Sequence, residues 1–109
     1  MYEGFYIVQF AGMEGKGGGV VLINRGQVFG GDSAYTYIGT YEVKGVRLLA
    51  KIEVQNFEPS IGEVMGIKGD YTLSLSLALK DGALVGEGTT PSAPGFGLKV
   101  KLTLRSKMV

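Results

Sequence analysis

The chain has 109 residues, with 11 basic and 10 acidic side chains and with neither cysteine nor histidine. This charge balance argues against a protein built mainly to bind nucleic acid, which usually shows a basic excess. The two missing residue types exclude disulfides, thiolate metal sites and any Ser-His or Cys-His catalytic pair.

The length predicts a single domain over residues 1–109 with one modest core. We find no basic N-terminal segment leading into an apolar run, and no run of about 18 apolar residues, so we expect neither a signal peptide nor a membrane span. Because small secreted domains often need disulfides, a cytoplasmic location is favoured. An enzyme would have to use tyrosine, carboxylate or lysine alone, so we expect a non-enzymatic protein without a cofactor.

The first part of the chain predicts four strands joined by short turns. Met13–Gly18 is expected to be a flexible glycine-rich turn, and Asn24-Arg25-Gly26 offers the positive φ angles of a hairpin turn. Tyr35, Tyr37 and Tyr41 alternate with smaller residues and therefore share one face of their strand. The four strands are expected at Phe5–Ala11, Val20–Ile23, Gln27–Phe29 and Tyr35–Glu42.

Gly30-Gly31-Asp32 is a candidate structural corner between two of these strands. The two glycines permit a bulge or a close approach of backbones, and Asp32 can close a turn onto its own backbone. The same three residues occur in the signature of cyclic-dinucleotide synthases, but here Ser-Ala follows them instead of an acidic and aromatic pair. We therefore interpret Gly30, Gly31 and Asp32 as a structural motif.

The second part of the chain predicts four more strands, most of them with one apolar and one polar face. In Tyr71–Leu79, for example, the apolar residues alternate strictly with Thr, Ser and Ala. Residues 56–70 differ in character and are expected to form a loop or a single helical turn over one end of the sheet. The four strands are expected at Val46–Gln55, Tyr71–Leu79, Leu84–Thr89 and Leu98–Arg105, the last with Leu104 on its inner face.

Eight strands joined mostly by short turns indicate either a sandwich or an up-and-down barrel. Consecutive hairpins favour a meander, and closure of the meander removes the edges that leucine-rich strands would expose. We therefore predict an all-β fold, an eight-stranded antiparallel barrel with at most one short helix, between Asn56 and Asp70.

The strand GFYIVQF, the hairpin VVLINRGQVFGGD and the following Tyr37-x-Gly39 resemble the GrlR-like family. These are small bacterial proteins named for a negative regulator of type III secretion. The resemblance implies a lipocalin-like barrel and a cytoplasmic regulator that acts by contact with a protein partner such as a transcription activator. The founding member carries an acidic run in the hairpin after its Tyr-x-Gly strand, whereas Glu42-Val43-Lys44-Gly45 has mixed charge. The same activator is therefore not expected as the partner.

An alternative function is that of an intracellular lipocalin-type binder or sensor of a small apolar ligand. An eight-stranded barrel either is filled by its side chains or holds one small ligand. The chain lacks the Gly-x-Trp signature of secreted lipocalins, because it contains no tryptophan. Five aromatic residues are candidates for lining such an interior, or for filling it as plain core: Tyr6, Phe29, Tyr35, Tyr37 and Tyr41.

A homodimer is also expected, because a small barrel that works by contact needs an exposed recognition surface. Leu49 lies in a row of mixed charge on one strand, which resembles the apolar centre and polar rim of a modest interface. The residues proposed for contact with a partner are Glu42, Lys44, Arg47, Leu49 and Lys51.

Overall fold

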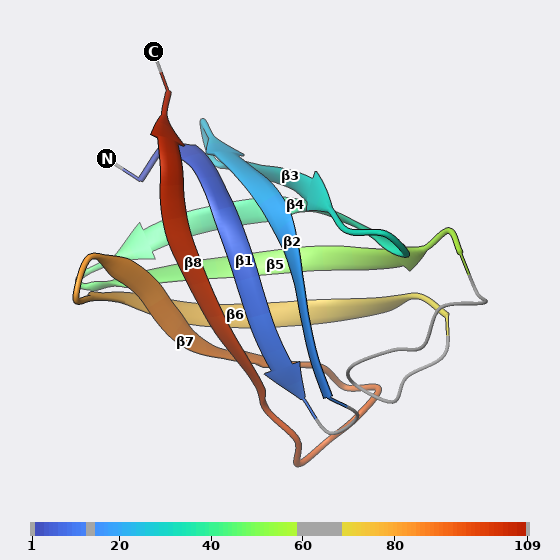
Figure 1. The fold of residues 1–109 in the computed structure, drawn as a ribbon. Helices are drawn as coiled ribbons and strands as arrows, with labels where there is room; N and C mark the ends of the chain where they lie inside the picture. The colour runs from blue at the N-terminus through green and yellow to red at the C-terminus, as the bar shows by residue number, and fades with distance from the viewer. Residues whose placement is uncertain (1, 13–14, 59–68, 109) are drawn as a thin grey trace.

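The computed structural model describes residues 2–12, 15–58 and 69–108, and its strands form one closed antiparallel barrel (Figure 1). Each strand pairs with the next one along the chain, and β1 closes the barrel against β8. The predicted eight-stranded up-and-down barrel is therefore confirmed. The strands are β1 (Gly4–Gly12), β2 (Gly15–Asn24), β3 (Gln27–Gly31), β4 (Tyr35–Lys44), β5 (Arg47–Asn56), β6 (Tyr71–Lys80), β7 (Ala83–Thr89) and β8 (Leu98–Lys107).

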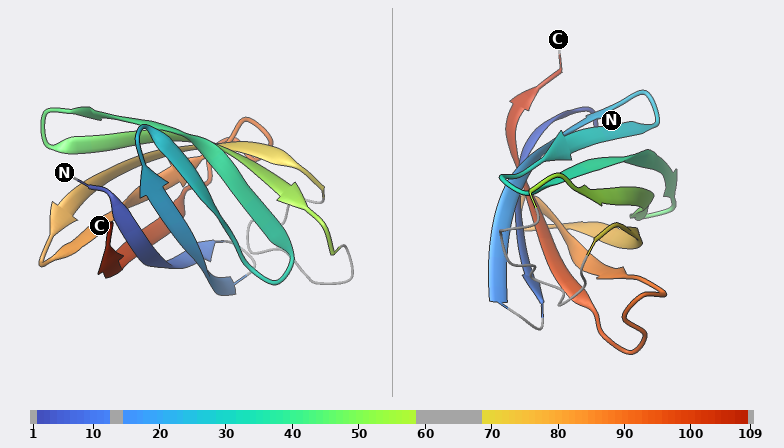
Figure 2. Two further views of the ribbon diagram at one scale, coloured as in Figure 1. Left: turned by 90° about the horizontal axis from the view of Figure 1, so that it is seen from above. Right: turned by 90° about the vertical axis from the view of Figure 1, so that its right-hand side faces the viewer.

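The two ends of the barrel are formed by different parts of the chain. Strands β8, β1 and β2 lie side by side and cross over β5 and β6 on the opposite wall (Figures 1 and 2). The two ends of the chain meet at one end of the barrel, where Gly4 pairs with Lys107. At the other end, β1 leads into β2 and the corner after β3 leads into β4.

Three of the predicted hairpin turns have the backbone that their residues favour. Arg25 and Gly26 both have positive φ, at 49° and 79°, and Asp81 and Gly82 repeat this at 52° and 81°. Two successive positive φ angles define the turn whose twist matches that of a two-stranded hairpin. Gly45, with a φ of 60°, begins the turn between β4 and β5.

Side chains on each strand alternate between the interior and the outer surface, as the sequence predicts. The most completely buried large residues are Ile23, Leu48, Leu77 and Leu84. Leu79 was predicted to lie on the same inner face as Leu77, but its side chain is 63% exposed because β6 has already passed the end of the barrel there. Leu104, predicted to face inward on β8, is 39% exposed near the chain ends.

Two predictions about glycines are wrong. The turn predicted over Met13–Gly18 is shorter than expected, because β2 begins at Gly15 and its glycines pair with β1. Gly30 and Gly31 do not interrupt β3 either, since they pair with Val21 and Val20 on β2. Backbone pairing needs no side chain, so a glycine run can extend a strand where another strand lies beside it.

The described residues contain no helix. The helical turn proposed between Asn56 and Asp70 falls mainly on residues 59–68, which lie outside the described residues. Within the described part of the chain, no helix is long and apolar enough to cross a membrane.

Candidate functional site

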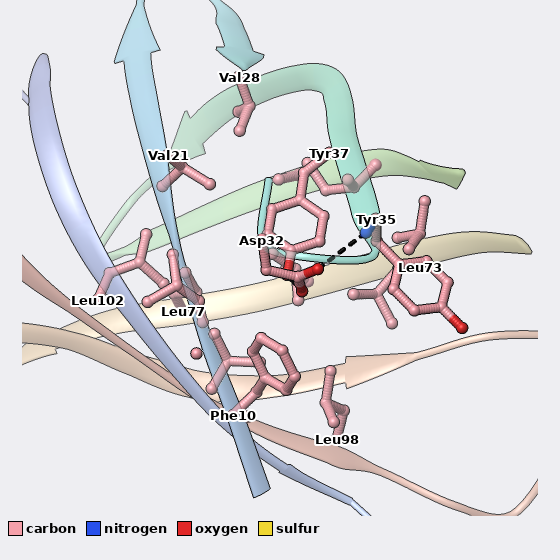
Figure 3. A pocket seen from close by; sticks show the side chains of 18 of the residues that line it. Phe10, Val21, Val28, Asp32, Tyr35, Tyr37, Leu73, Leu77, Leu98 and Leu102 are labelled. Carbon is pink, nitrogen blue, oxygen red and sulfur yellow. Dashed lines mark hydrogen bonds between the residues drawn. The ribbon is translucent and has the colours of Figure 1, made fainter. Parts of the chain in front are cut away.

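A cavity of about 280 Å³ lies inside the barrel, and its wall is mostly aliphatic (Figure 3). At its inner end it is bounded by Ile23, Leu48, Leu77 and Leu102. Its other end reaches the surface beside Lys16 and Ser33, which are both exposed. Further lining residues are Val8, Val21, Val28, Ala50, Ile52, Val54, Leu73, Leu75, Leu98 and Val100.

The inward glycines of β2 and β3 make room for the ring of Tyr37. A Cβ atom at Gly19 would lie 3.2 Å from Cε2 of Tyr37, and Gly30 is the direct cross-strand partner of Tyr37. A Cβ at Gly30 would also overlap the carbonyl oxygen of Val20, so no other residue fits there without a shift of the backbone. The two glycines therefore allow a large aromatic side chain to lie inside a narrow barrel.

Asp32 forms the predicted corner between β3 and β4. Its Oδ1 accepts hydrogen bonds from the backbone NH groups of Ala34 and Tyr35, each at 2.8 Å. Its own backbone NH donates to the carbonyl oxygen of Tyr35 at 2.9 Å. The second carboxylate oxygen accepts a hydrogen bond from the Tyr37 hydroxyl. Asp32 thus fixes both the turn and the ring that borders the cavity, as the interpretation of a structural corner predicts.

Four aromatic side chains surround the outer part of the cavity. Phe10 meets Tyr37 edge to face with ring centroids 6.5 Å apart, and Tyr35 meets Tyr71 in a similar arrangement at 6.4 Å. Such edge-to-face pairs hold aromatic rings in defined positions. They come from β1, β4 and β6, so the outer part of the cavity depends on closure of the whole barrel.

The tyrosine hydroxyls beside the cavity are held in their neutral form. Burial is the main cause that raises the pKa of Tyr71 to about 12, and the nearby Tyr35 and Asp32 add to it. Burial also raises the pKa of Tyr37, and its hydrogen bond to the Asp32 carboxylate acts in the same direction. Tyrosine is uncharged at neutral pH even at its ordinary pKa of 10, and the raised values extend this neutral form into more alkaline solution. As neutral hydroxyls, the two groups can exchange hydrogen bonds with a polar group on a ligand.

Two of the five predicted interior aromatics border the cavity, namely Tyr35 and Tyr37. Tyr6 and Tyr41 also point inward, but they lie toward the end where the chain termini meet. The Tyr6 hydroxyl donates to the carbonyl oxygen of Tyr2 at 2.7 Å, and the Tyr41 hydroxyl donates to the Glu3 carboxylate at 3.1 Å. These two residues therefore close the barrel at that end.

The prediction that Phe29 lines the interior is wrong. Val28 points into the core instead, and Phe29 lies on the outer surface with 41% of its side chain exposed. The pairing of Val28 with the inward Gly39 sets this register. Because side chains alternate along a strand, a difference of one residue moves each of them to the other face.

The five predicted partner-binding residues lie together on the hairpin of β4 and β5. Lys44 and Glu42 form an exposed ion pair with Nζ and Oε1 3.5 Å apart, and Arg47 donates to the Ser76 hydroxyl at 3.2 Å. Lys51 is exposed. Leu49, proposed as the centre of an interface, is only partly exposed and borders a second hollow that is lined by residues of β4, β5, β6 and β7.

The sequence prediction missed Phe10 and Tyr71 as residues of the site. For both residues the alternation along the strand predicts an inward side chain. Phe10 continues the alternation of Tyr6 and Val8, and Tyr71 begins the apolar row of β6. Neither signal shows that the two side chains reach the same end of one cavity, since 61 positions of the chain separate them.

The described residues contain no group of three or more Asp or Glu side chains that could hold a metal ion. Comparison with protein-family models gives no match, and no curated protein matches the chain.

Proposed function

We propose that this barrel binds one small apolar molecule in its interior. The observation that carries the proposal is the cavity of about 280 Å³, aliphatic at its inner end and bordered by hydroxyl groups where it reaches the surface. Ligand pockets are concave, mostly apolar and supplied with a few polar groups that fix orientation. Because pockets for drug-sized ligands measure about 300 to 1,000 Å³, we expect a ligand smaller than those.

The arrangement of the wall predicts how such a ligand lies. Its apolar part would contact the leucine and isoleucine side chains at the inner end, and its polar group would remain near Tyr71 and Ser33. Burial of apolar groups contributes about 0.8 kcal/mol per CH₂ group. We propose binding without catalysis, because Asp32, the one carboxylate among the described lining residues, already accepts three hydrogen bonds.

A series of straight-chain primary alcohols of increasing length tests this proposal. Calorimetry on protein purified without detergent should show saturable binding that strengthens by roughly fourfold for each added CH₂, and then levels off once the cavity is full. Absence of saturable binding along the whole series would refute it.

A matched pair of variants locates the binding site. Ala50→Leu adds volume to the cavity wall, so it should shorten the alcohol at which binding levels off. Ala78→Leu makes the same change at a position opposite Arg47, on the outer face of β6, and should leave binding unchanged. Equal effects of the two variants would show that the alcohols bind elsewhere.

We propose as a second candidate that the chain is a cytoplasmic regulator of the GrlR-like kind, which acts by contact through the β4–β5 hairpin. The observation in its favour is the tip of this hairpin, where Val46 is 79% exposed and Val43 is also exposed beside the Glu42–Lys44 ion pair. An apolar tip with charged neighbours provides both a contact and a means of discriminating between partners.

A pull-down from a bacterial lysate tests the second candidate. Recovery of a transcription activator by the wild type, and its loss with the double variant Val43→Ser and Val46→Ser, would support it. Lys80→Ser, at the neighbouring β6–β7 hairpin, serves as the control and should retain the partner. An eluate that contains no regulatory protein would contradict it.

A further inference from the structure

Tyr71 brings a hydroxyl group to the outer part of the cavity. It begins β6 and lies half-buried in the cavity wall, with its ring held against the ring of Tyr35. Within the part of the chain that the structure describes, no group makes a hydrogen bond with this hydroxyl. Tyr37 differs, because its hydroxyl donates to Asp32. A hydroxyl that is partly removed from water gains from a partner, so Tyr71 offers a hydrogen bond to a bound molecule.

Asp32 sets the charge in this part of the cavity, since it is the one carboxylate among the described lining residues. Its oxygens already accept hydrogen bonds from two backbone NH groups and from the hydroxyl of Tyr37 beside it (Figure 3). After burial and the neighbouring Tyr35, the charge of Asp32 is a further cause that raises the pKa of Tyr71. The negative charge therefore reaches the Tyr71 hydroxyl, and it opposes a second anion placed there.

The cavity also provides little for a positively charged group. Lys16 is the one basic residue among the described lining residues, and it is exposed, so water and salt screen its charge and it offsets Asp32 only weakly. A cationic head group would be attracted to Asp32, but the mostly aliphatic wall cannot replace the water that the cation loses. Head groups of either charge are therefore disfavoured, and an uncharged one fits this part of the cavity.

We propose that the cavity selects an uncharged molecule whose single polar group is an oxygen that accepts a hydrogen bond from the Tyr71 hydroxyl. This names the class of ligand, and it rests on the proposed function, the binding of an apolar molecule in the interior. A ketone or an alcohol supplies such an oxygen. A fatty acid and an alkyl amine do not fit, because both are charged at neutral pH. The hydrocarbon part of the ligand would lie against Leu48 and Leu77 at the inner end.

A comparison of head groups at one chain length tests the proposal. Calorimetry at neutral pH should show that a straight-chain methyl ketone binds at least about tenfold more tightly than the carboxylate or the primary ammonium ion of the same length. An ion that binds as tightly as the ketone would overturn the inference and leave the proposed function standing. The inference would also fall alone if alcohols bound and the ketone did not. Failure of the ketone, both ions and the alcohol series would refute the proposed function as well.

Three variants test the roles of the two side chains. Tyr71→Phe removes only the hydroxyl and should weaken binding of the ketone about fivefold. Tyr41→Phe makes the same change at the other end of the barrel and should leave the affinity for the ketone unchanged. Asp32→Asn removes the charge but keeps an oxygen, so it should raise the affinity for the carboxylate relative to the ketone. Circular dichroism of each variant checks that the barrel is intact. Unchanged ketone binding in Tyr71→Phe, or an unchanged ratio in Asp32→Asn, would overturn the inference.

Discussion

The Tyr37 hydroxyl donates a hydrogen bond to the Asp32 carboxylate. The same carboxylate accepts hydrogen bonds from the backbone NH groups of Ala34 and Tyr35 in the corner that follows it. One side chain thus orients the turn between β3 and β4 and the aromatic ring beside the cavity. A change at Asp32 should therefore affect both the stability of the barrel and the shape of its cavity.

We predict that Asp32→Ala lowers the free energy of unfolding by about 3 kcal/mol, because it leaves partly buried donors without an acceptor. Asp32→Asn keeps an oxygen for the backbone NH groups and should lose less. Tyr37→Phe removes one hydroxyl and should cost about 1 kcal/mol. Urea unfolding of these variants and of Asp32→Ala with Tyr37→Phe completes a double-mutant cycle. Additive losses would show that the two side chains are not coupled.

Two leucines on inner-facing positions of β6 should lose very different amounts of folding stability when each is replaced by alanine. Leu77 is fully buried, whereas Leu79 is 63% exposed. Leu77→Ala should therefore lower the free energy of unfolding by about 3 kcal/mol, from lost burial and the cavity that remains. Leu79→Ala should lower it by less than about 1 kcal/mol. Chemical denaturation of both variants measures this, and equal losses would place the end of the barrel elsewhere.

Much of the fold could be predicted because alternation along a strand is a local property. Tyr71–Leu79 and Tyr35–Glu42 each have enough residues to show which face is apolar, and the structure confirms their strands and inner faces except at Leu79, which is exposed. Gln27–Phe29 is too short for this, and Phe29 was assigned to the interior because it is aromatic. Only its pairing with Ile38 decides that it faces outward.

The cavity could be predicted as an alternative to a filled core, but its presence could not be decided from the sequence. Its volume depends on how the inward glycines of β2 and β3 face the rings of β1 and β4, and on closure of these strands against β5, β6 and β8, which lie farther along the chain. The raised pKa of Tyr71 is likewise a result of packing, because it comes mainly from burial and then from the neighbouring Tyr35 and Asp32. Local sequence patterns contain neither relationship.

Gly39 provides a test of close approach between strands. A Cβ atom there would overlap the carbonyl oxygen of Lys51 and lie 2.9 Å from the Cα of Ile52, so backbone would have to move. We predict that Gly39→Ala lowers the melting temperature clearly, with a loss of about 1–3 kcal/mol. Gly18→Ala is the matched control, because its new Cβ would meet only the Val8 carbonyl oxygen, at 3.1 Å. A larger loss for Gly18→Ala would contradict this account of the two strands.

Gly31→Val should also destabilise the barrel by about 1–3 kcal/mol, although not through its backbone angles. Gly31 lies in β3 without a positive φ, but a Cβ atom would come within 2.7 Å of the Tyr35 carbonyl oxygen. That oxygen belongs to the Asp32 corner, so a side chain at Gly31 should open the corner. An unchanged melting temperature would mean that the corner adapts without cost.

The raised pKa of Tyr71 predicts that the barrel loses stability at high pH. Burial raises this pKa from 10 to about 12, so the folded state retains the proton at a pH where the unfolded state has begun to release it. The resulting stabilisation is fully present below about pH 10 and is lost as the pH rises toward 12. Tyr37 acts in the same direction, because its pKa is raised as well.

Tyrosinate absorbance during a pH titration should show late-titrating groups among the six tyrosines, coupled to unfolding. Tyr71→Phe should remove one of these groups and flatten the decline in stability between pH 10 and 12. If Tyr71→Phe left the titration and the decline unchanged, Tyr71 would be open to solvent and the outer part of the cavity would be wider than described.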